Sequence, residues 1–353
     1  MTSTQLILLL GPGGVGKTTC SASLACALAT QNKKVLVLTV DPAKRLAQAL
    51  GFSQLESSLQ TVTHHQIKGS LQATWLNHNN PLEQLVTRHI SNPTNLKKLM
   101  NHRFFKIVEH QLGGLNDYLS IESIINYYQM GVYDYIVVDT PPYQQALDFF
   151  NSPQELIKFF DQSILNQFTQ PTTTDDSSNH FLKKRLQQVT SFGKEKLTNT
   201  FKNLIGKEFF LELSEFLKAM QPLHSQFITQ SHLINKLLSS ASFFFVSTPE
   251  NHSLDMSLEL FKKTHLQFQK GSKSFIINKC YQSSSPLQNL SKHSKLIELI
   301  NESITKQNTI LHSLSQINEI KSVTQLSRRY EKNLKLESLL QIGQTIKTHG
   351  FKS

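Results

Sequence analysis

The sequence has few cysteines and no long hydrophobic run. Cys20, Cys26 and Cys280 are the three cysteines in 353 residues, and no two of them form a CxxC pair, which argues against a disulfide framework or a cysteine zinc site. Apolar runs such as Leu6–Leu10 and Phe243–Val246 are far shorter than the roughly 20 residues that cross a bilayer. The N-terminus shows a strand pattern within five residues, without room for a secretory signal. We therefore expect a cytoplasmic protein with no integral membrane segment.

Histidine clusters and concentrated basic motifs are also missing. The 14 histidines are dispersed, with no HxxxH pair that would place two metal ligands on one helical face. The net charge is +11, and most of the excess falls within residues 241–353. These lysines and arginines are scattered and carry no RNA-binding or zinc-finger signature. The charge therefore indicates a solvated surface rather than a nucleic-acid site.

Short apolar runs alternate with helical patterns along the chain. The run Gln5–Leu10 is followed by a glycine-rich turn, a helix-forming segment at Thr18–Ala29 and a second run at Val35–Val40, the order of a parallel βαβ unit. Further buried strands are predicted at Tyr135–Val138, Phe243–Ser247 and Phe275–Asn278. The pattern predicts an α/β fold with a doubly wound, mostly parallel sheet and a helical subdomain.

Two longer helical regions separate the predicted strands. We predict one domain over residues 1–353, with a core from about 1–80, 131–150 and 241–353 and helical insertions at about 81–130 and 151–240. The polar segment Thr172–Ser178 is predicted to be an exposed loop. Within the second insertion, an apolar stripe repeats at helical spacing. It indicates either a groove for a hydrophobic partner or, the interpretation we favour, ordinary helix packing. Its members are Phe209, Phe210, Leu213, Phe216, Leu217, Met220, Leu223, Phe227, Ile234, Leu237 and Leu238.

Residues 11–18 read GPGGVGKT, a full GxxxxGK[ST] pattern placed between a predicted strand and helix. This motif predicts that the fold is that of a P-loop NTPase and that residues 1–353 form a P-loop ATPase domain. Glycines let backbone N–H groups approach phosphates closely, and the helix N-terminus adds a partial positive charge. Lys17 is expected to reach the β and γ phosphates, and the Thr18 hydroxyl to bind Mg²⁺. The predicted nucleotide contacts of this loop are Gly11, Gly13, Gly14, Val15, Gly16, Lys17, Thr18 and Thr19, with ATP and Mg²⁺ as the cofactors.

Two aspartates follow predicted strands. Asp139 ends the strand at Tyr135–Val138, so its carboxylate is expected at the carboxyl edge of the sheet, holding Mg²⁺ through a water. Asp41 follows the strand at Val35–Val40 and is expected at the same edge. Asp41 either orients or deprotonates the attacking water, or is a capping or turn residue before Pro42.

Several segments resemble the ArsA-like ATPases, the arsenite-pump and tail-anchored-protein-targeting ATPases of the deviant Walker A class. The resemblance is carried by GPGGVGKTT at 11–19, VLVLTVDPAKRLAQALG at 35–51 and YDYIVVDTPPYQQALDFF at 133–150. GLNDYLSIESI at 114–124 is similar to bacterial members, and FVSTPE at 245–250 and IINK at 276–279 extend the resemblance over nearly the whole chain. Only the stretch around 165–200 has no feature that matches.

The resemblance implies roles for individual residues. Asp41 matches the first-switch aspartate that handles the hydrolytic water, which makes Lys17 and Asp41 the expected catalytic residues. Asp139 matches the aspartate that opens the second switch, and Asn278 matches the asparagine that contacts the adenine ring. The family also implies a homodimer, or a heterodimer with a related ATPase, and an unknown protein or hydrophobic client.

The sequence departs from the family pattern at two places. Pro12 stands where members usually carry a lysine that reaches the partner's nucleotide, so turnover is expected to be slow unless Lys44, Arg45 or a partner chain replaces that charge. Tyr143, with the two glutamines after it, stands where a threonine, glycine, histidine triplet is usual. The cysteines of arsenite pumps, zinc-binding targeting ATPases and nitrogenase-reductase relatives are missing, which argues against metalloid transport and electron transfer.

Two other functions remain open at this point. A nucleotide-gated binding module with little turnover would fit Pro12 and the altered second switch. A membrane- or DNA-positioning ATPase resembling MinD or ParA would share the deviant P-loop, although the C-terminal region lacks a clean amphipathic membrane helix.

Overall fold

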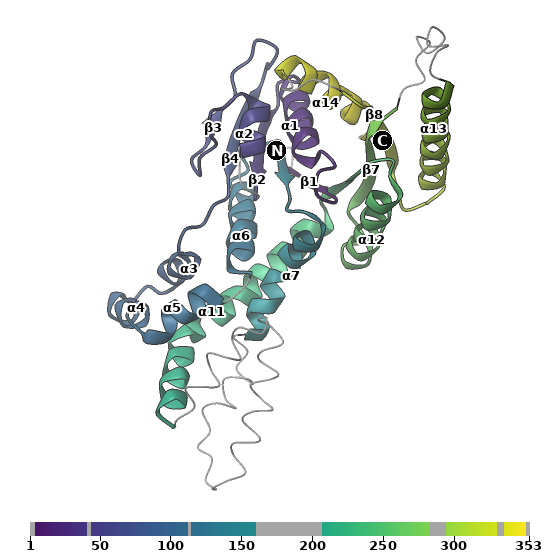
Figure 1. Cartoon of the computed structure of the whole chain (residues 1–353). Coiled ribbons are helices and arrows are strands. Elements are labelled where there is room, and N and C mark those ends of the chain that lie inside the picture. Colours follow the sequence, from purple (N-terminus) through teal and green to yellow (C-terminus); the bar gives the residue numbers. More distant parts are fainter. Residues whose placement is uncertain are drawn as a thin grey trace, which may run out of the picture. The chain divides into compact units, whose positions relative to one another are not determined.

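The computed structural model describes residues 4–40, 44–111, 114–159, 207–281, 294–329 and 335–350. The chain is divided into two compact units, whose helices and strands are labelled in Figure 1. Unit 1 comprises Met1–Leu76, Ile124–Leu147 and Asn235–Ser353, and unit 2 comprises Asn77–Ser123 and Asp148–Ile234. All strands of the described residues, and the glycine-rich loop, belong to unit 1.

Unit 1 is built on an eight-stranded sheet in the order β3-β4-β2-β5-β1-β6-β7-β8. All neighbouring strands pair in parallel except β3 and β4, which confirms the predicted doubly wound α/β class. The strands are β1 Gln5–Leu10, β2 Lys34–Thr39, β3 Gln60–Thr61, β4 Ser70–Trp75, β5 Tyr135–Asp139, β6 Ser242–Ser247, β7 Ser272–Cys280 and β8 Ser322–Ser327.

Strand β1 lies at the point where the strand order reverses. After β1 the chain builds the β2 and β4 side, returns to insert β5 beside β1, and then builds β6, β7 and β8 on the other side. In such sheets, ligands bind outside the carboxyl ends of the strands at this reversal. The loop that leaves β1 is therefore placed where a nucleotide would be expected.

Alternate residues of the buried strands face opposite layers of helices. Ile7 and Leu9 of β1 share one apolar cluster with helices α1 (Lys17–Ala29) and α14 (Leu336–Gly350). On β6 and β7, Phe245 and Phe275 pack with Phe261 of helix α12 (Asn251–Gln267), with ring centroids 5.3–5.7 Å apart. Both faces of the central strands are thus covered, which explains their nearly continuous hydrophobic sequences.

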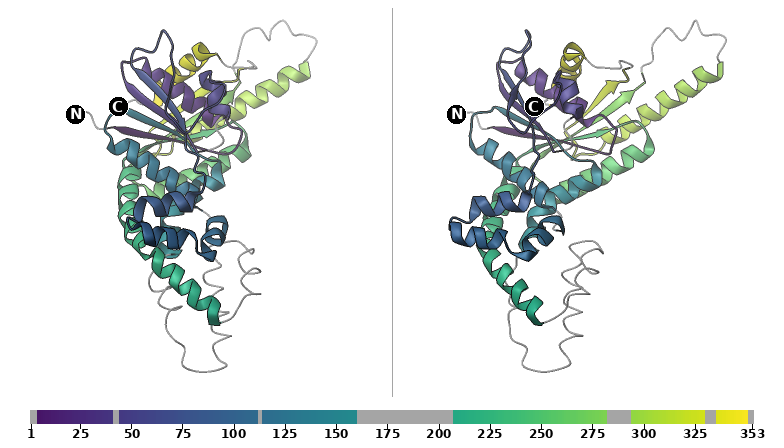
Figure 2. Two further views of the ribbon diagram at one scale, coloured as in Figure 1. Left: turned by 90° about the vertical axis from the view of Figure 1, so that its left-hand side faces the viewer. Right: turned by 60° about the vertical axis from the view of Figure 1, so that its left-hand side comes forward.

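Five helices of the described residues surround the sheet within unit 1: α1 Lys17–Ala29, α2 Lys44–Leu50, α12 Asn251–Gln267, α13 Ser294–Ser315 and α14 Leu336–Gly350. Figure 2 shows α1 and α14 side by side on one face of the sheet and α12 on the other. Helix α1 begins at the glycine-rich loop, so contacts that fix the position of α1 also fix the position of that loop.

The contact between α1 and α14 depends on small residues. Gly343 of α14 lies directly over the carbonyl of Ser23, and Ala27 lies beside it one turn further along α1. A side chain at position 343 would overlap with the Ser23 carbonyl group. The two helices can therefore approach closely only because position 343 has no Cβ atom.

Unit 2 is helical. It contains α3 Pro81–His89, α4 Pro93–Met100 and α5 Arg103–Gln111, and the larger parts of α6 Leu115–Gln129, α7 Tyr143–Phe159 and α11 Lys207–Ser239. The boundary between the two units falls within α6, α7 and α11, so these three helices continue the chain from one unit into the other. No helix among the described residues is long and apolar enough to cross a membrane.

Apolar residues of α11 form the core of unit 2. Phe216, Met220, Leu223 and Phe227 are fully buried and pack in one cluster with residues of α3, α5 and α6. For these four residues the interpretation of the apolar stripe as ordinary helix packing is confirmed. The side chains at 209, 210, 213 and 217, and the predicted loop at 172–178, lie outside what the structure describes.

Candidate functional site

The loop between β1 and α1 has a backbone that only glycine fits at two positions. Gly16 precedes the first residue of α1 with φ 98°, in the left-handed region. Gly11 has φ 153°, and a Cβ atom there would overlap with the carbonyl oxygen of Val246 on β6. A Cβ atom on Gly16 would overlap with the side chain of Asn278. The loop is therefore held closely against β6 and the end of β7, a cradle that side chains would fill.

Lys17 is buried inside this loop. The residue is 7% exposed, and its Nζ atom donates hydrogen bonds of 3.0 Å to the carbonyl oxygens of Gly11 and Pro12. Burying an ammonium group is costly unless acceptors surround it. These contacts hold the ammonium within the loop that was predicted from the sequence to bind phosphate.

Asp139 lies at the end of β5, next to the ends of β1 and β2. Its Cα atom is in register with those of Leu9 and Thr39, and its side chain is 2% exposed. The hydroxyl of Ser21 donates to Oδ1 and that of Thr39 donates to Oδ2, both at 3.3 Å. The carboxylate is thus held at the carboxyl edge of the sheet, as predicted from its place at the strand end, by Thr39 and by Ser21, which lies one helical turn after Lys17. The partners Ser21 and Thr39 were not predicted.

Burial, with a smaller contribution from Asp139, keeps the thiol of Cys20 protonated. Burial, together with the charge of Asp139, raises the pKa of Cys20 to about 12. A thiol with so high a pKa is a poor nucleophile and metal ligand. Cys20 therefore acts as a small buried side chain, as expected from the sequence.

The residues at the loop fit a magnesium ion that accompanies a nucleotide. Thr18 is half-buried in the first turn of α1, and α1 also carries Ser21, which holds Asp139. No group of three or more histidine, cysteine, aspartate or glutamate side chains that could hold a metal occurs among the described residues. Mg²⁺ usually keeps several waters and takes only one or two carboxylates in addition to substrate phosphates. The Thr18 hydroxyl and the Asp139 carboxylate are a donor set of this kind.

The segment after Asp139 is attached to both β1 and α12. The Thr140 hydroxyl donates to the carbonyl oxygen of Leu9 at 2.7 Å. Tyr143 begins α7 and lies beneath the ammonium of Lys263, 5.9 Å from the ring centroid. At the position where ArsA-like ATPases usually have a threonine, glycine, histidine triplet, this chain therefore has an aromatic contact with α12.

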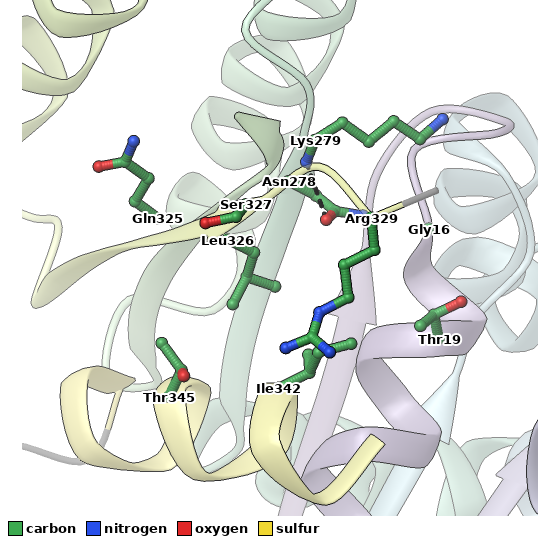
Figure 3. Close-up of a pocket in the computed structure, with 10 residues that line it drawn as sticks. All are labelled: Gly16, Thr19, Asn278, Lys279, Gln325, Leu326, Ser327, Arg329, Ile342 and Thr345. Carbon is green, nitrogen blue, oxygen red and sulfur yellow. Dashed lines mark hydrogen bonds between the residues drawn. The ribbon is translucent and has the colours of Figure 1, made fainter. Parts of the chain in front are cut away.

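Asn278 and a cavity lie on the other side of the loop. The Nδ2 atom of Asn278 donates to the carbonyl oxygen of Val15 at 2.8 Å. Beside it is a cavity of about 230 Å³ (Figure 3). It is lined by Gly16, Thr19, Asn278, Lys279, Gln325, Leu326, Ser327, Arg329, Ile342 and Thr345. Asn278 was predicted from the family resemblance as a contact of the adenine ring, whereas the residues that β8 and α14 contribute to the cavity were not predicted.

Arg329 extends from the end of β8 toward α14 in Figure 3. Both of its terminal nitrogens donate to the Oε1 atom of Gln341 at 3.3 Å. Arg329 lines the cavity, and a planar guanidinium is a suitable surface for stacking on an aromatic ring.

Three further residues were predicted to act at the site. Asp41 lies outside the described residues. Lys44 and Arg45, the predicted substitutes for the missing lysine, are exposed at the start of α2.

The sequence pattern of the anion-transporting ATPase family matches residues 4–328. A protein of Aquifex aeolicus with the provisional name arsenical pump-driving ATPase 2 is 26% identical over 261 residues, which cover 68% of this chain and 68% of that protein. The ATPase get3 of Schizosaccharomyces japonicus is 26% identical over 255 residues, 67% of this chain and 76% of that protein. The ATPase ASNA1 homolog of Babesia bovis is 30% identical over 196 residues, 51% of this chain and 50% of that protein.

The family match covers most of the chain, and it includes the loop, Lys17 and Asp139 that the structure brings together. The resemblance to ArsA-like ATPases is confirmed. The chain belongs to the anion-transporting ATPase family, and it is an enzyme that hydrolyses ATP.

Proposed function

We propose that the chain binds ATP with Mg²⁺ at the loop of residues 11–18 and couples binding and hydrolysis to a conformational change that controls a partner. One observation supports this most directly: Lys17 and Asp139 are both buried and held by hydrogen bonds at the carboxyl edge of the sheet. Two opposite charges buried at that edge, beside a glycine-rich loop, suit a polyphosphate and its metal ion.

The phosphates are proposed to lie against the backbone N–H groups at the start of α1. The helix N-terminus attracts negative charge, and Lys17 neutralises part of it. Thr18 and Asp139, the latter through a water, would hold the metal ion, which supplies neutralisation of the charge on the phosphate oxygens.

The adenine base is proposed to enter the cavity beside Asn278. Its volume of about 230 Å³ is below the roughly 300–1,000 Å³ of most small-molecule sites, so it suits one part of a nucleotide. The Asn278 amide lies at the rim of this cavity, and the Arg329 guanidinium offers a stacking surface. Asn278 is proposed to read the base edge.

Coupling is proposed to run along α7. Asp139 and Thr140 contact the ends of β1 and β2, and three residues later α7 begins and continues into unit 2. A shift of this segment with nucleotide state would therefore be passed to the unit that lacks the loop. We propose that unit 2 binds a protein or hydrophobic client and that two copies, or this chain and a related ATPase, act together.

Asp41 is proposed to handle the attacking water, since it follows the end of β2 by two residues and β2 ends beside Asp139. Replacing Asp41 with asparagine should leave ATP binding unchanged and lower hydrolysis by about 100-fold or more, the range for loss of a general base. Steady-state hydrolysis and equilibrium binding of Mg-ATP test this, with Asp255→Asn, an exposed aspartate of α12, as the control. Hydrolysis at the wild-type rate by the Asp41 variant would refute the assignment.

A nucleotide-gated module with little turnover is the second candidate. Pro12 favours it, because this residue offers no charge to a neighbouring nucleotide. Tight binding of Mg-ATP by the wild-type chain, with phosphate release only slightly above that of a sample with excess chelator, would support it over the first candidate.

A further inference from the structure

The loop of residues 11–18 receives support from a strand that is far away in the sequence. Its tip, Gly13 and Gly14, is exposed, and Pro12 before it carries no charge. Lys17 is turned inward to the carbonyls of Gly11 and Pro12. The loop itself therefore places no cationic side chain on its exposed tip.

The end of β7 has an irregular backbone at the residues that face this loop. The pairing of β7 with β8 shifts register between Ile277 and Cys280, and bulges of this kind often turn a side chain toward a functional site. Lys279, within the shift, has φ 60°, which is uncommon for a residue other than glycine. The Asn278 Oδ1 atom accepts the backbone N–H of Lys279 at 2.9 Å and stabilises this turn.

The irregular backbone directs two neighbouring side chains onto two consecutive peptide groups of the loop. Lys279 donates from Nζ to the carbonyl oxygen of Gly14, and Asn278 donates from Nδ2 to that of Val15, both at 2.8 Å. Both residues are drawn in Figure 3. In a phosphate loop the backbone N–H groups face the anion. Holding the carbonyls from the β7 side thus leaves these N–H groups available for phosphate.

We propose that Lys279 is a positioning residue of this loop and supplies, from within the same chain, the positive charge that Pro12 does not provide. The proposal rests on nucleotide binding at residues 11–18. Many exposed lysine contacts contribute little. Lys279 differs because both the register shift and the left-handed backbone occur at its position, and because its ammonium contacts the loop tip itself. Lys44 and Arg45, which the sequence suggested as other sources of this positive charge, are exposed at the start of α2.

Three variants separate the charge from the hydrogen bond: Lys279→Ala, Lys279→Gln and Lys279→Arg. Lys279→Ala should raise both the Kd for a non-hydrolysable Mg-ATP analogue and the KM for Mg-ATP by about tenfold, the size expected for one charge-assisted hydrogen bond. Its kcat and its Tm without nucleotide should stay within about twofold and about 2 °C of wild type, because the loop contact lies on the surface. Lys279→Arg should restore binding to within about threefold, and Lys279→Gln should not, because only arginine keeps the charge.

Lys262→Ala, at an exposed lysine of α12, is the matched control and should bind like wild type. A Lys279→Ala chain with wild-type Kd and KM would overturn the proposal, and so would full rescue by glutamine, since that would show that the charge is not used. These results differ from failure of the proposed function, in which the wild-type chain itself would not bind the analogue.

Discussion

Lys17→Ala is expected to hydrolyse ATP at least about 100-fold more slowly than the wild-type chain, the typical effect of removing one preorganised charge from a phosphoryl-transfer site. In the wild type the ammonium is already inside the loop, held by the Gly11 and Pro12 carbonyls. It therefore needs little rearrangement when phosphate binds. Alanine removes the charge and leaves these two carbonyl oxygens without their donor.

The comparison for Lys17→Ala is made by steady-state phosphate release, with Lys306→Ala as the control. Lys306 is an exposed lysine of α13, so its loss changes the net charge equally without touching the loop. Wild-type turnover by Lys17→Ala would show that hydrolysis does not take place at this loop.

Gly343→Ala is expected to lower the free energy of unfolding by about 2–3 kcal/mol, within the range for overpacking a close contact. The new methyl group would overlap with the Ser23 carbonyl group and come close to the Ala27 side chain. Both belong to α1, whose backbone cannot move away without shifting the loop before it. Binding of Mg-ATP should weaken as well, because α14 holds α1 from outside.

Urea unfolding of Gly343→Ala is compared with that of His349→Ala, which changes an exposed residue of the same helix and should cost less than about 0.5 kcal/mol. Equal stability of the two variants would mean that α14 does not need a glycine at this crossing.

The central strands could be predicted from the sequence because they are buried on both faces. Leu6–Leu10 and Phe243–Val246 are continuous apolar runs, and both lie inside strands of the structure. Strands β4 and β8 were missed because they lie near or at the edges of the sheet. Their sequences, SLQATW and SVTQLS, mix apolar and polar residues, and such short alternation is hard to distinguish from a loop.

Some residues of the candidate site could likewise be predicted from local sequence, and others could not. The loop of residues 11–18 could be predicted because its elements are contiguous in the sequence, and Asp139 because it ends a buried strand. Ser21 and Thr39, which hold Asp139, lie 118 and 100 residues from it, and only the sheet order brings them together. Lys279 could not be predicted because its position depends on a register shift and a positive φ that its sequence does not reveal.

Hydrogen exchange of the wild-type chain, without nucleotide and with Mg-ADP or a non-hydrolysable Mg-ATP analogue, tests the central claim most directly. We predict that either nucleotide slows exchange of the amides at residues 11–18, and that exchange within α7 differs between the two nucleotides because the segment from Asp139 connects the loop to unit 2. Binding of both nucleotides with no change at residues 11–18, or with identical exchange in α7, would contradict the account.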